Sequence, residues 1–169
     1  ELSYQIDSKH DLNLIENIIK NRGKFEMIKT NLIKKCKKIK IILTDVDGVL
    51  TDGSRYYSDK GEILKKFHVR DGMGVNILLR NGIKTIIVTK ENSKITKKWA
   101  KEMNITKTIS GSLKKENELS KICEKFDVSE SEVAYIGDDV NDLVLLKKVG
   151  FSAVPNDASD IIKEHVDYV

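Results

Sequence analysis

The sequence contains few of the features that indicate a secreted, membrane-bound or disulfide-stabilised protein. It has two cysteines in 169 residues, Cys36 within a lysine run and Cys123 on the face of an expected helix. Their spacing fits neither a metal site nor a redox pair, so we expect reduced thiols in a reducing compartment. No apolar run approaches the ~20 residues that span a bilayer, and no signal peptide is recognisable. These absences favour a cytoplasmic protein without a membrane partner.

Aromatic residues are scarce where a nucleic-acid site would need them. Residues 20–40 carry nine Lys or Arg but only one acid, Glu26, and one aromatic, Phe25. A basic run with almost no aromatic side chains to stack on nucleic-acid bases is more typical of a solvated linker or helix than of an RNA site. With 40% hydrophobic and 33% charged residues, the chain can bury one core of ordinary size.

Short apolar runs alternate with amphipathic stretches from residue 38 onward. We expect strands near 39–45, 83–89, 106–109, 132–137 and 151–154, and helices near 9–21, 72–81, 92–103, 114–126, 140–149 and 157–164. This alternation predicts an α/β fold, a Rossmann-like parallel sheet with helices on both faces. An Asp-Lys-Gly turn within residues 54–66 predicts a β-hairpin flap. No insertion is large enough for a cap domain.

A pair of carboxylates directly follows the first expected strand. Residues 40–52 read KIILTDVDGVLTD, which places Asp45 and Asp47 two residues apart, with Gly48 next to them. On an extended backbone such residues point to the same face, and glycine permits a sharp turn just beyond them. Two carboxylates in one small pocket repel unless a cation binds them or one takes a proton. The pair indicates Mg²⁺, acid/base chemistry or both, and a plain acidic turn is the alternative.

A second acidic cluster follows another apolar run. Residues 133–142 read VAYIGDDVND, so Asp138 and Asp139 come after a strand and begin a helical pattern. In open parallel sheets, ligands bind beyond the carboxyl ends of the strands. We therefore expect the two clusters to meet at one edge of the sheet.

These motifs, in this order, resemble those of the haloacid dehalogenase superfamily of phosphotransferases. The first motif, Asp-x-Asp-Gly, matches residues 45–48, and the fourth, Gly-Asp-Asp-x-x-Asp, matches residues 137–142. Thr89 ends a β-rich run and matches the second motif. The third-motif lysine is Lys114 or Lys115, and the family's Gly-x-x-x-Lys spacing favours Lys115.

The resemblance implies an active phosphatase. Asp45 would attack phosphorus to give an aspartyl-phosphate, and Asp47 would protonate the departing sugar oxygen and then deprotonate water. Thr89 and Lys115 would bind the phosphoryl oxygens and so contact the substrate.

The same resemblance implies a Mg²⁺ site. The ion would be bound by Asp45, the backbone carbonyl of Asp47 and Asp138, because a hard cation prefers oxygen ligands. Asp139 would assist through a water molecule. Asp142 would orient Lys115 or the loop.

Residues 45–53 and 68–74 narrow the resemblance to a cap-less branch, the 3-deoxy-octulosonate 8-phosphate and nonulosonate 9-phosphate phosphatases, which form homotetramers. The octulosonate enzymes usually carry Thr-Gly-Arg after the second motif, whereas residues 89–92 read TKEN. Variants of this kind are more similar to the nonulosonate enzymes, so a nine-carbon sugar acid is favoured and the octulosonate comes next. In this branch the hairpin packs against neighbouring subunits; the alternative is that its apolar residues form only its own face.

The N-terminal stretch resembles a different family. Residues 3–16 are similar to the closing segment of CMP-sugar-acid cytidylyltransferases, and the chain opens with Glu1 rather than Met. We expect residues 1–37 to be the tail and linker of a covalently attached CMP-N-acylneuraminate cytidylyltransferase, which would place the protein in sialic acid biosynthesis, and residues 38–169 to be the phosphatase domain. The alternative for the N-terminus is an ordinary capped helix. At residues 165–169 the chain lacks the Gly-rich tail usual in the branch.

Arg70 is the candidate for substrate selectivity, because arginine binds a carboxylate through two hydrogen bonds and sugar acids carry one. A structural pairing with Asp71 or with a neighbouring subunit is the alternative. The rival function for the whole domain is a non-catalytic module that tetramerises an attached synthetase. The presence of every acidic motif residue favours the enzyme.

Overall fold

This computed structural model describes residues 30–169, so the helix expected near 9–21 and the resemblance at residues 3–16 lie outside the described part. The chain divides into two compact units, residues 1–37 and 38–169. Of the first unit, residues 30–36 are helical. The second unit contains all the elements described below.

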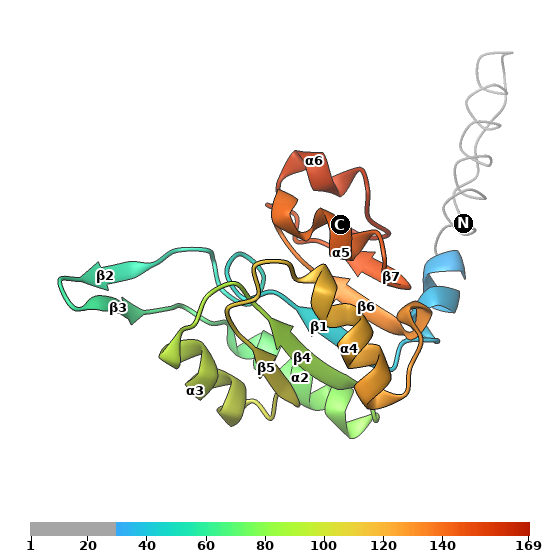
Figure 1. The fold of residues 1–169 in the computed structure, drawn as a ribbon, viewed down its shortest axis with the longest axis horizontal. Coiled ribbons are helices and arrows are strands. Elements are labelled where there is room, and N and C mark those ends of the chain that lie inside the picture. Colours follow the sequence, from blue (N-terminus) through green and yellow to red (C-terminus); the bar gives the residue numbers. More distant parts are fainter. Residues whose placement is uncertain (1–29) are drawn as a thin grey trace, which may run out of the picture. The chain divides into compact units, whose positions relative to one another are not determined.

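A five-stranded sheet forms the centre of the second unit (Figure 1). Its strands are β1 (Ile41–Thr44), β4 (Lys84–Val88), β5 (Lys107–Ile109), β6 (Val133–Ile136) and β7 (Phe151–Ala153). They run parallel in the order β5-β4-β1-β6-β7. All five predicted strands are confirmed, and β1 lies in the middle between β4 and β6.

Helices cover both faces of the sheet, as predicted. They are α2 (Val69–Arg80), α3 (Lys94–Glu102), α4 (Glu116–Phe126), α5 (Leu143–Leu146) and α6 (Asp160–Lys163). The larger core lies between one face of the sheet and α4, α5 and α6, and includes Leu43, Leu119 and Ile162, which are completely buried. On the other face, Ile87 packs with Ala100 of α3. Within residues 30–169 no helix has the length and apolar character needed to span a bilayer.

Three helices differ from the prediction by three residues or more at one or both ends, and the other described helices by at most two. Helix α2 begins three residues earlier than expected, because the His68 side chain accepts a hydrogen bond from Arg70 N at 3.1 Å and caps the first turn. The stretch expected at 140–149 starts as a 3₁₀ turn over Val140–Asp142 and is α-helical only over α5. The last helix is α6 alone, since residues 155–159 form turns first.

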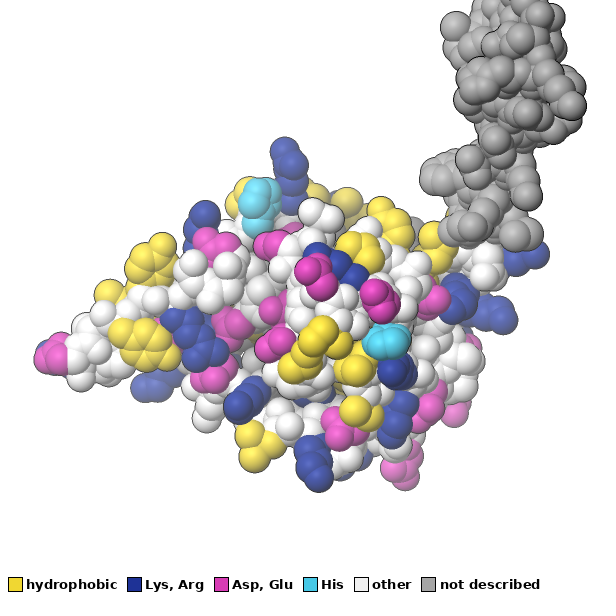
Figure 2. All heavy atoms as spheres, turned by 90° about the horizontal axis from the view of Figure 1, so that it is seen from above, with side chains coloured by type: hydrophobic (Ala, Val, Ile, Leu, Met, Phe, Trp, Pro, Cys, Tyr) yellow, Lys and Arg dark blue, Asp and Glu magenta, His cyan; other side chains and the backbone are white. Residues whose placement is uncertain are grey.

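The predicted hairpin is present as β2 (Tyr56–Ser58) and β3 (Gly61–Leu64), inserted between β1 and α2. Gly61 has φ +109° at the turn, a conformation that favours glycine. The hairpin projects from the sheet (Figure 1), and the space-filling view shows apolar side chains on it among polar and charged ones (Figure 2). Tyr57 and Ile63 are each 60% exposed. A flap without a cap leaves the carboxyl edge of the sheet open.

Candidate active site

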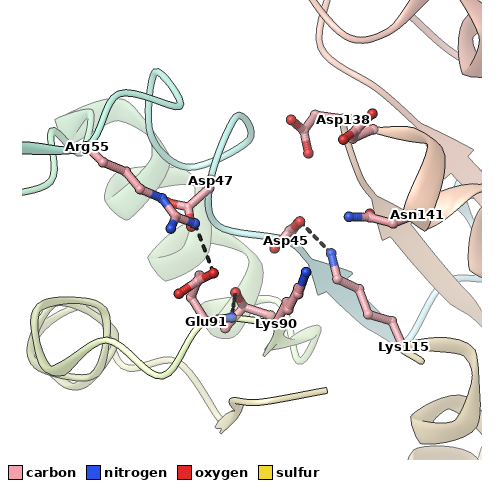
Figure 3. Close-up of a pocket in the computed structure, with 10 residues that line it drawn as sticks. Asp45, Asp47, Arg55, Lys90, Glu91, Lys115, Asp138 and Asn141 are labelled. Atoms are coloured by element: carbon pink, nitrogen blue, oxygen red, sulfur yellow. Dashed lines mark hydrogen bonds and ion pairs between the residues drawn. The ribbon is translucent and has the colours of Figure 1, made fainter. Parts of the chain in front are cut away.

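A polar cavity of about 240 Å³ lies at the carboxyl ends of the central strands (Figure 3). Its lining consists entirely of polar and charged residues: Asp45, Asp47, Arg55, Thr89, Lys90, Glu91, Lys115, Asp138, Asp139 and Asn141. Because β1 pairs with β6, the residues that follow these two strands become neighbours. The structure thus brings together both acidic clusters, Thr89 and Lys115.

Asp45 directly follows the central strand and is 8% exposed. One carboxylate oxygen accepts a hydrogen bond from Val46 N at 2.7 Å, and the other forms an ion pair with Lys115. Burial raises the pKa of Asp45 even though the Lys115 charge opposes that effect. The carboxylate is therefore held in one orientation at the cavity, as a nucleophile requires.

Lys115 lines the cavity and belongs to a buried network of hydrogen bonds, whereas Lys114 is exposed. Its ammonium donates to Asp142 Oδ1 at 2.7 Å and to the Tyr135 hydroxyl at 3.3 Å. Tyr135 in turn donates to the same Asp142 oxygen at 2.6 Å. Burial acts to lower the pKa of Lys115, but the two carboxylates outweigh it and the pKa is raised. The lysine thus remains a cation next to Asp45.

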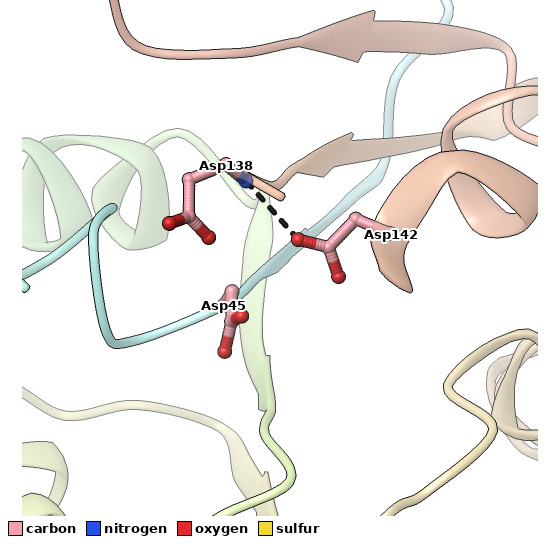
Figure 4. A group of neighbouring side chains, drawn as sticks. All are labelled: Asp45, Asp138 and Asp142. Atoms are coloured by element: carbon pink, nitrogen blue, oxygen red, sulfur yellow. Dashed lines mark hydrogen bonds between the residues drawn. The ribbon is translucent and has the colours of Figure 1, made fainter. Parts of the chain in front are cut away.

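The geometry fits a cation between Asp45 and Asp138. Ligand oxygens of Asp45, Asp138 and Asp142 lie within 4.8 Å of one another (Figure 4). Asp142 is fully occupied as an acceptor, because its second oxygen receives Asp138 N at 3.0 Å and Asp139 N at 3.4 Å. The Asp138 carboxylate, in contrast, makes no hydrogen bond within residues 30–169.

The electrostatics of Asp138 point to the same site. Burial, followed by the charges of Asp45 and Asp142, raises its pKa to about 7. A divalent cation would remove this repulsion. Space for the carboxylate depends on Gly48, where φ is +83° and an added Cβ would lie 2.0 Å from Asp138 Oδ2.

Two other predicted site residues each use a side-chain oxygen to accept a hydrogen bond from a nearby backbone N–H. Asp139 is exposed and accepts Val140 N at 2.7 Å, a capping contact of the 3₁₀ turn. Thr89 is 2% exposed, and its hydroxyl oxygen accepts Glu91 N at 3.2 Å. Both still line the cavity.

Arg70 is not brought together with the other predicted residues. It lies in the first turn of α2 and lines a separate cavity of about 200 Å³ with Leu50 and Thr85, on the sheet face opposite the main core. The alternative to substrate binding was an ion pair between Arg70 and Asp71, and residues 30–169 contain no such ion pair. Its role in binding substrate stays a prediction without support from the geometry.

Two charged residues that the sequence did not single out lie at the cavity or next to it: Arg55 is part of its lining, and Lys65 is buried beside it. Arg55 precedes β2, and its guanidinium contacts Asp47 Oδ2 at 3.1 Å and Glu91 Oε1 at 3.2 Å. Lys65, just after β3, forms an ion pair with the other Asp47 oxygen. Nothing in their spacing relates them to Asp47, although each sits at the base of one hairpin arm.

Comparison with known proteins shows the family to which this chain is similar. The family profile of haloacid dehalogenase-like hydrolases matches residues 80–169. The 3-deoxy-D-manno-octulosonate 8-phosphate phosphatase KdsC of Escherichia coli K12 is 35% identical over 142 residues, which cover 84% of this chain and 76% of that protein. The KdsC of Haemophilus influenzae is 37% identical over 136 residues, 80% of this chain and 76% of that protein.

Solved structures show the same fold. A 3-deoxy-D-manno-octulosonate 8-phosphate phosphatase from Moraxella catarrhalis, in complex with magnesium ion, phosphate ion and KDO, has a TM-score of 0.79 at 34% identity, covering 82% of this chain and 79% of that one. The cobalt-bound deoxy-D-mannose-octulosonate 8-phosphate phosphatase from Haemophilus influenzae has a TM-score of 0.77 at 37% identity, covering 80% and 79%.

Proposed function

This chain belongs to the haloacid dehalogenase-like hydrolases and is a phosphatase, and from that premise we propose that it hydrolyses the phosphate monoester of a 3-deoxy sugar acid through an aspartyl-phosphate. The observation that carries the proposal is the convergence of Asp45, Thr89, Lys115 and Asp138 on one polar cavity. A phosphoryl group has three oxygens whose charge must be neutralised, and this cavity offers cations and donors for them.

In the first step, an Asp45 oxygen forms a bond to phosphorus as the bond between phosphorus and the sugar oxygen breaks. Asp47 gives its proton to the departing sugar oxygen. Lys115 and the Thr89 hydroxyl bind oxygens of the phosphoryl group.

In the second step, water attacks phosphorus and the bond to Asp45 breaks. Asp47, now a carboxylate, accepts the proton from that water and returns to its starting state. Phosphate leaves, and Asp45 is restored as a carboxylate.

A metal ion fits the oxygen ligands of Asp45 and Asp138, and we propose Mg²⁺, the ion named with the Moraxella enzyme. When bound, it supplies positive charge opposite the phosphoryl oxygens. The Asp47 carbonyl is proposed as a third ligand, and Asp139 as a ligand through water. Because Asp139 already caps a turn, we expect its contribution to be the smaller.

For the substrate, the named relatives support octulosonate 8-phosphate. A specific observation favours the nonulosonate 9-phosphate as a second candidate, since Lys90 and Glu91 of the TKEN stretch line the cavity. Lys90 is also the lining cation that has no acidic partner within residues 30–169, and in Figure 3 it extends toward the cavity. We propose that it pairs with the carboxylate of the sugar acid.

The test is phosphate release with Mg²⁺ from octulosonate 8-phosphate, N-acetylneuraminate 9-phosphate and its deaminated analogue. We expect turnover on at least one of them and none in the Asp45→Asn protein. The sugar with the highest kcat/KM identifies the substrate. If the folded protein releases phosphate from none of them, the non-catalytic tetramerisation module becomes the better account.

A further inference from the structure

Lys65 is a buried cation that the proposed mechanism does not use. Its side chain is 0% exposed, and it is absent from the lining of the cavity. A buried ammonium is stable only when it is paired. Its partners are Asp47 Oδ1 and, at 3.4 Å, Glu62 Oε1 of strand β3.

These contacts connect the hairpin to the loop after β4. The second oxygen of Glu62 accepts a hydrogen bond from the Ser93 hydroxyl at 2.6 Å, and Ser93 caps the first turn of α3. Lys65 thus lies between the Asp47 carboxylate and Glu62, whose side chain is held by the N-cap residue of α3.

The opposite arm of the hairpin approaches the same carboxylate. Arg55 Nη2 contacts Asp47 Oδ2 at 3.1 Å and Glu91 Oε1 at 3.2 Å, and Figure 3 shows the guanidinium lying against both side chains. Each Asp47 oxygen therefore has a cation from a different arm of one hairpin.

We propose that Lys65 and Arg55 are positioning residues that fix the Asp47 side chain for proton transfer. Lys65 stays on Oδ1, while the more exposed Arg55 keeps its second partner Glu91 and leaves Oδ2 to carry the proton that passes to the leaving group and is regained from water. The proposal rests on the acid/base role proposed for Asp47. An aspartate side chain has several staggered rotamers, and two cations on its two oxygens select one of them. Proton transfer needs heavy atoms within about 2.6–3.2 Å, and a misplacement of about 1 Å can cost about 10²-fold in rate.

The leaving group distinguishes this role from a merely structural one. When the bond between phosphorus and a sugar oxygen breaks, that oxygen becomes a strongly basic alkoxide unless Asp47 protonates it. A p-nitrophenolate ion is stable without a proton, so its departure from p-nitrophenyl phosphate does not depend on the placement of Asp47. The value of kcat/KM reports this first step for both substrates.

The experiment compares kcat/KM of Lys65→Met on the sugar-acid phosphate and on p-nitrophenyl phosphate. We expect a loss of about 10- to 100-fold on the sugar phosphate and a loss below about 3-fold on the aryl phosphate. Lys66→Met is the matched control, because Lys66 is 71% exposed and pairs with Asp52 at 3.2 Å outside the cavity. We expect it to change neither value. An equal loss on both substrates in Lys65→Met would overturn the proposal.

Asp47→Asn separates this proposal from the proposed function. If Asp47→Asn loses both substrates equally, the acid role of Asp47 fails. If it loses the sugar phosphate selectively but Lys65→Met does not, only the positioning role fails. Should Lys65→Met not fold, Arg55→Gln decides, since that side chain is 33% exposed; a selective loss supports the proposal and an equal loss refutes it.

Discussion

Replacing Asp138 by Asn should have opposite effects on stability with and without metal. The Asp138 carboxyl has a pKa of about 7, well above the ordinary value near 4, because it is buried next to Asp45 and Asp142. The metal-free fold therefore binds a proton that the unfolded chain has released between these two pH values. The protonated Asp138 carboxyl makes its full contribution to the stability of the metal-free fold below pH ~4, and this contribution is lost as the pH rises through about 7.

The size of the effect follows from that shift. Three pKa units correspond to at most about 4 kcal/mol. Because Asp138 is only half-buried, screening by solvent reduces the repulsion to about 1–2 kcal/mol. At pH 8 without metal, Asp138→Asn should thus melt about 2–8 °C above the parent protein. At pH ~4 and below, where Asp138 is protonated in both the folded and the unfolded chain, the two proteins should melt together.

Mg²⁺ should reverse the order. A ligand at 100 times its Kd stabilises the folded state by about 2.7 kcal/mol, and only the parent protein retains the Asp138 ligand. Thermal melts at pH 8, with a chelator and with excess Mg²⁺, measure both effects, and Asp157→Asn on the exposed surface is the matched control. If Asp138→Asn melts below the parent without metal, or gains as much from Mg²⁺, the reasoning about this site is wrong.

Three further changes test the rest of the site. Lys115→Met leaves two buried carboxylates without their cation, so it should lower the free energy of unfolding by about 3–5 kcal/mol and abolish turnover. The control Lys114→Met should change neither stability nor turnover. Denaturant titration measures the stability and phosphate release the turnover, and equal effects of the two substitutions would contradict the buried network. Tyr135→Phe removes a buried donor and should cost about 1–3 kcal/mol while most turnover remains; unchanged stability would show that the hydroxyl contributes nothing. Lys90→Met should raise KM for the sugar-acid phosphate about tenfold but leave p-nitrophenyl phosphate unaffected, and equal changes in both KM values would remove the carboxylate role.

Local pattern was sufficient to predict most of the fold. The three central strands, β1, β4 and β6, are short apolar runs that are mostly buried, and burial on both faces is what makes such runs recognisable. The helix ends were less predictable, since they depend on capping side chains. His68 lengthens α2, while the turn chemistry of residues 155–159 shortens α6.

Some residues of the site could likewise be predicted from the sequence, and others could not. Asp45, Asp47 and Asp138 were predictable because strand ends in a parallel sheet share one edge. Arg55 and Lys65 were not, because their relation to Asp47 depends on how the hairpin folds back, which no periodicity encodes. Arg70 was selected for its chemistry alone, and its position on α2 directs it to another cavity.

The position of β1 at the centre of the sheet also has a consequence for how the protein is made. Asp45 and Asp138 become neighbours only when β1 pairs with β6, about ninety residues later in the chain. At a synthesis rate of about 5–20 residues per second, the strand bearing the nucleophile leaves the ribosome roughly 5–20 s before its partner strand exists. During that interval β1 can pair only with β4, and its other edge is exposed to solvent and to other chains. The order of strands that assembles the cavity therefore makes it one of the last parts of the molecule to form.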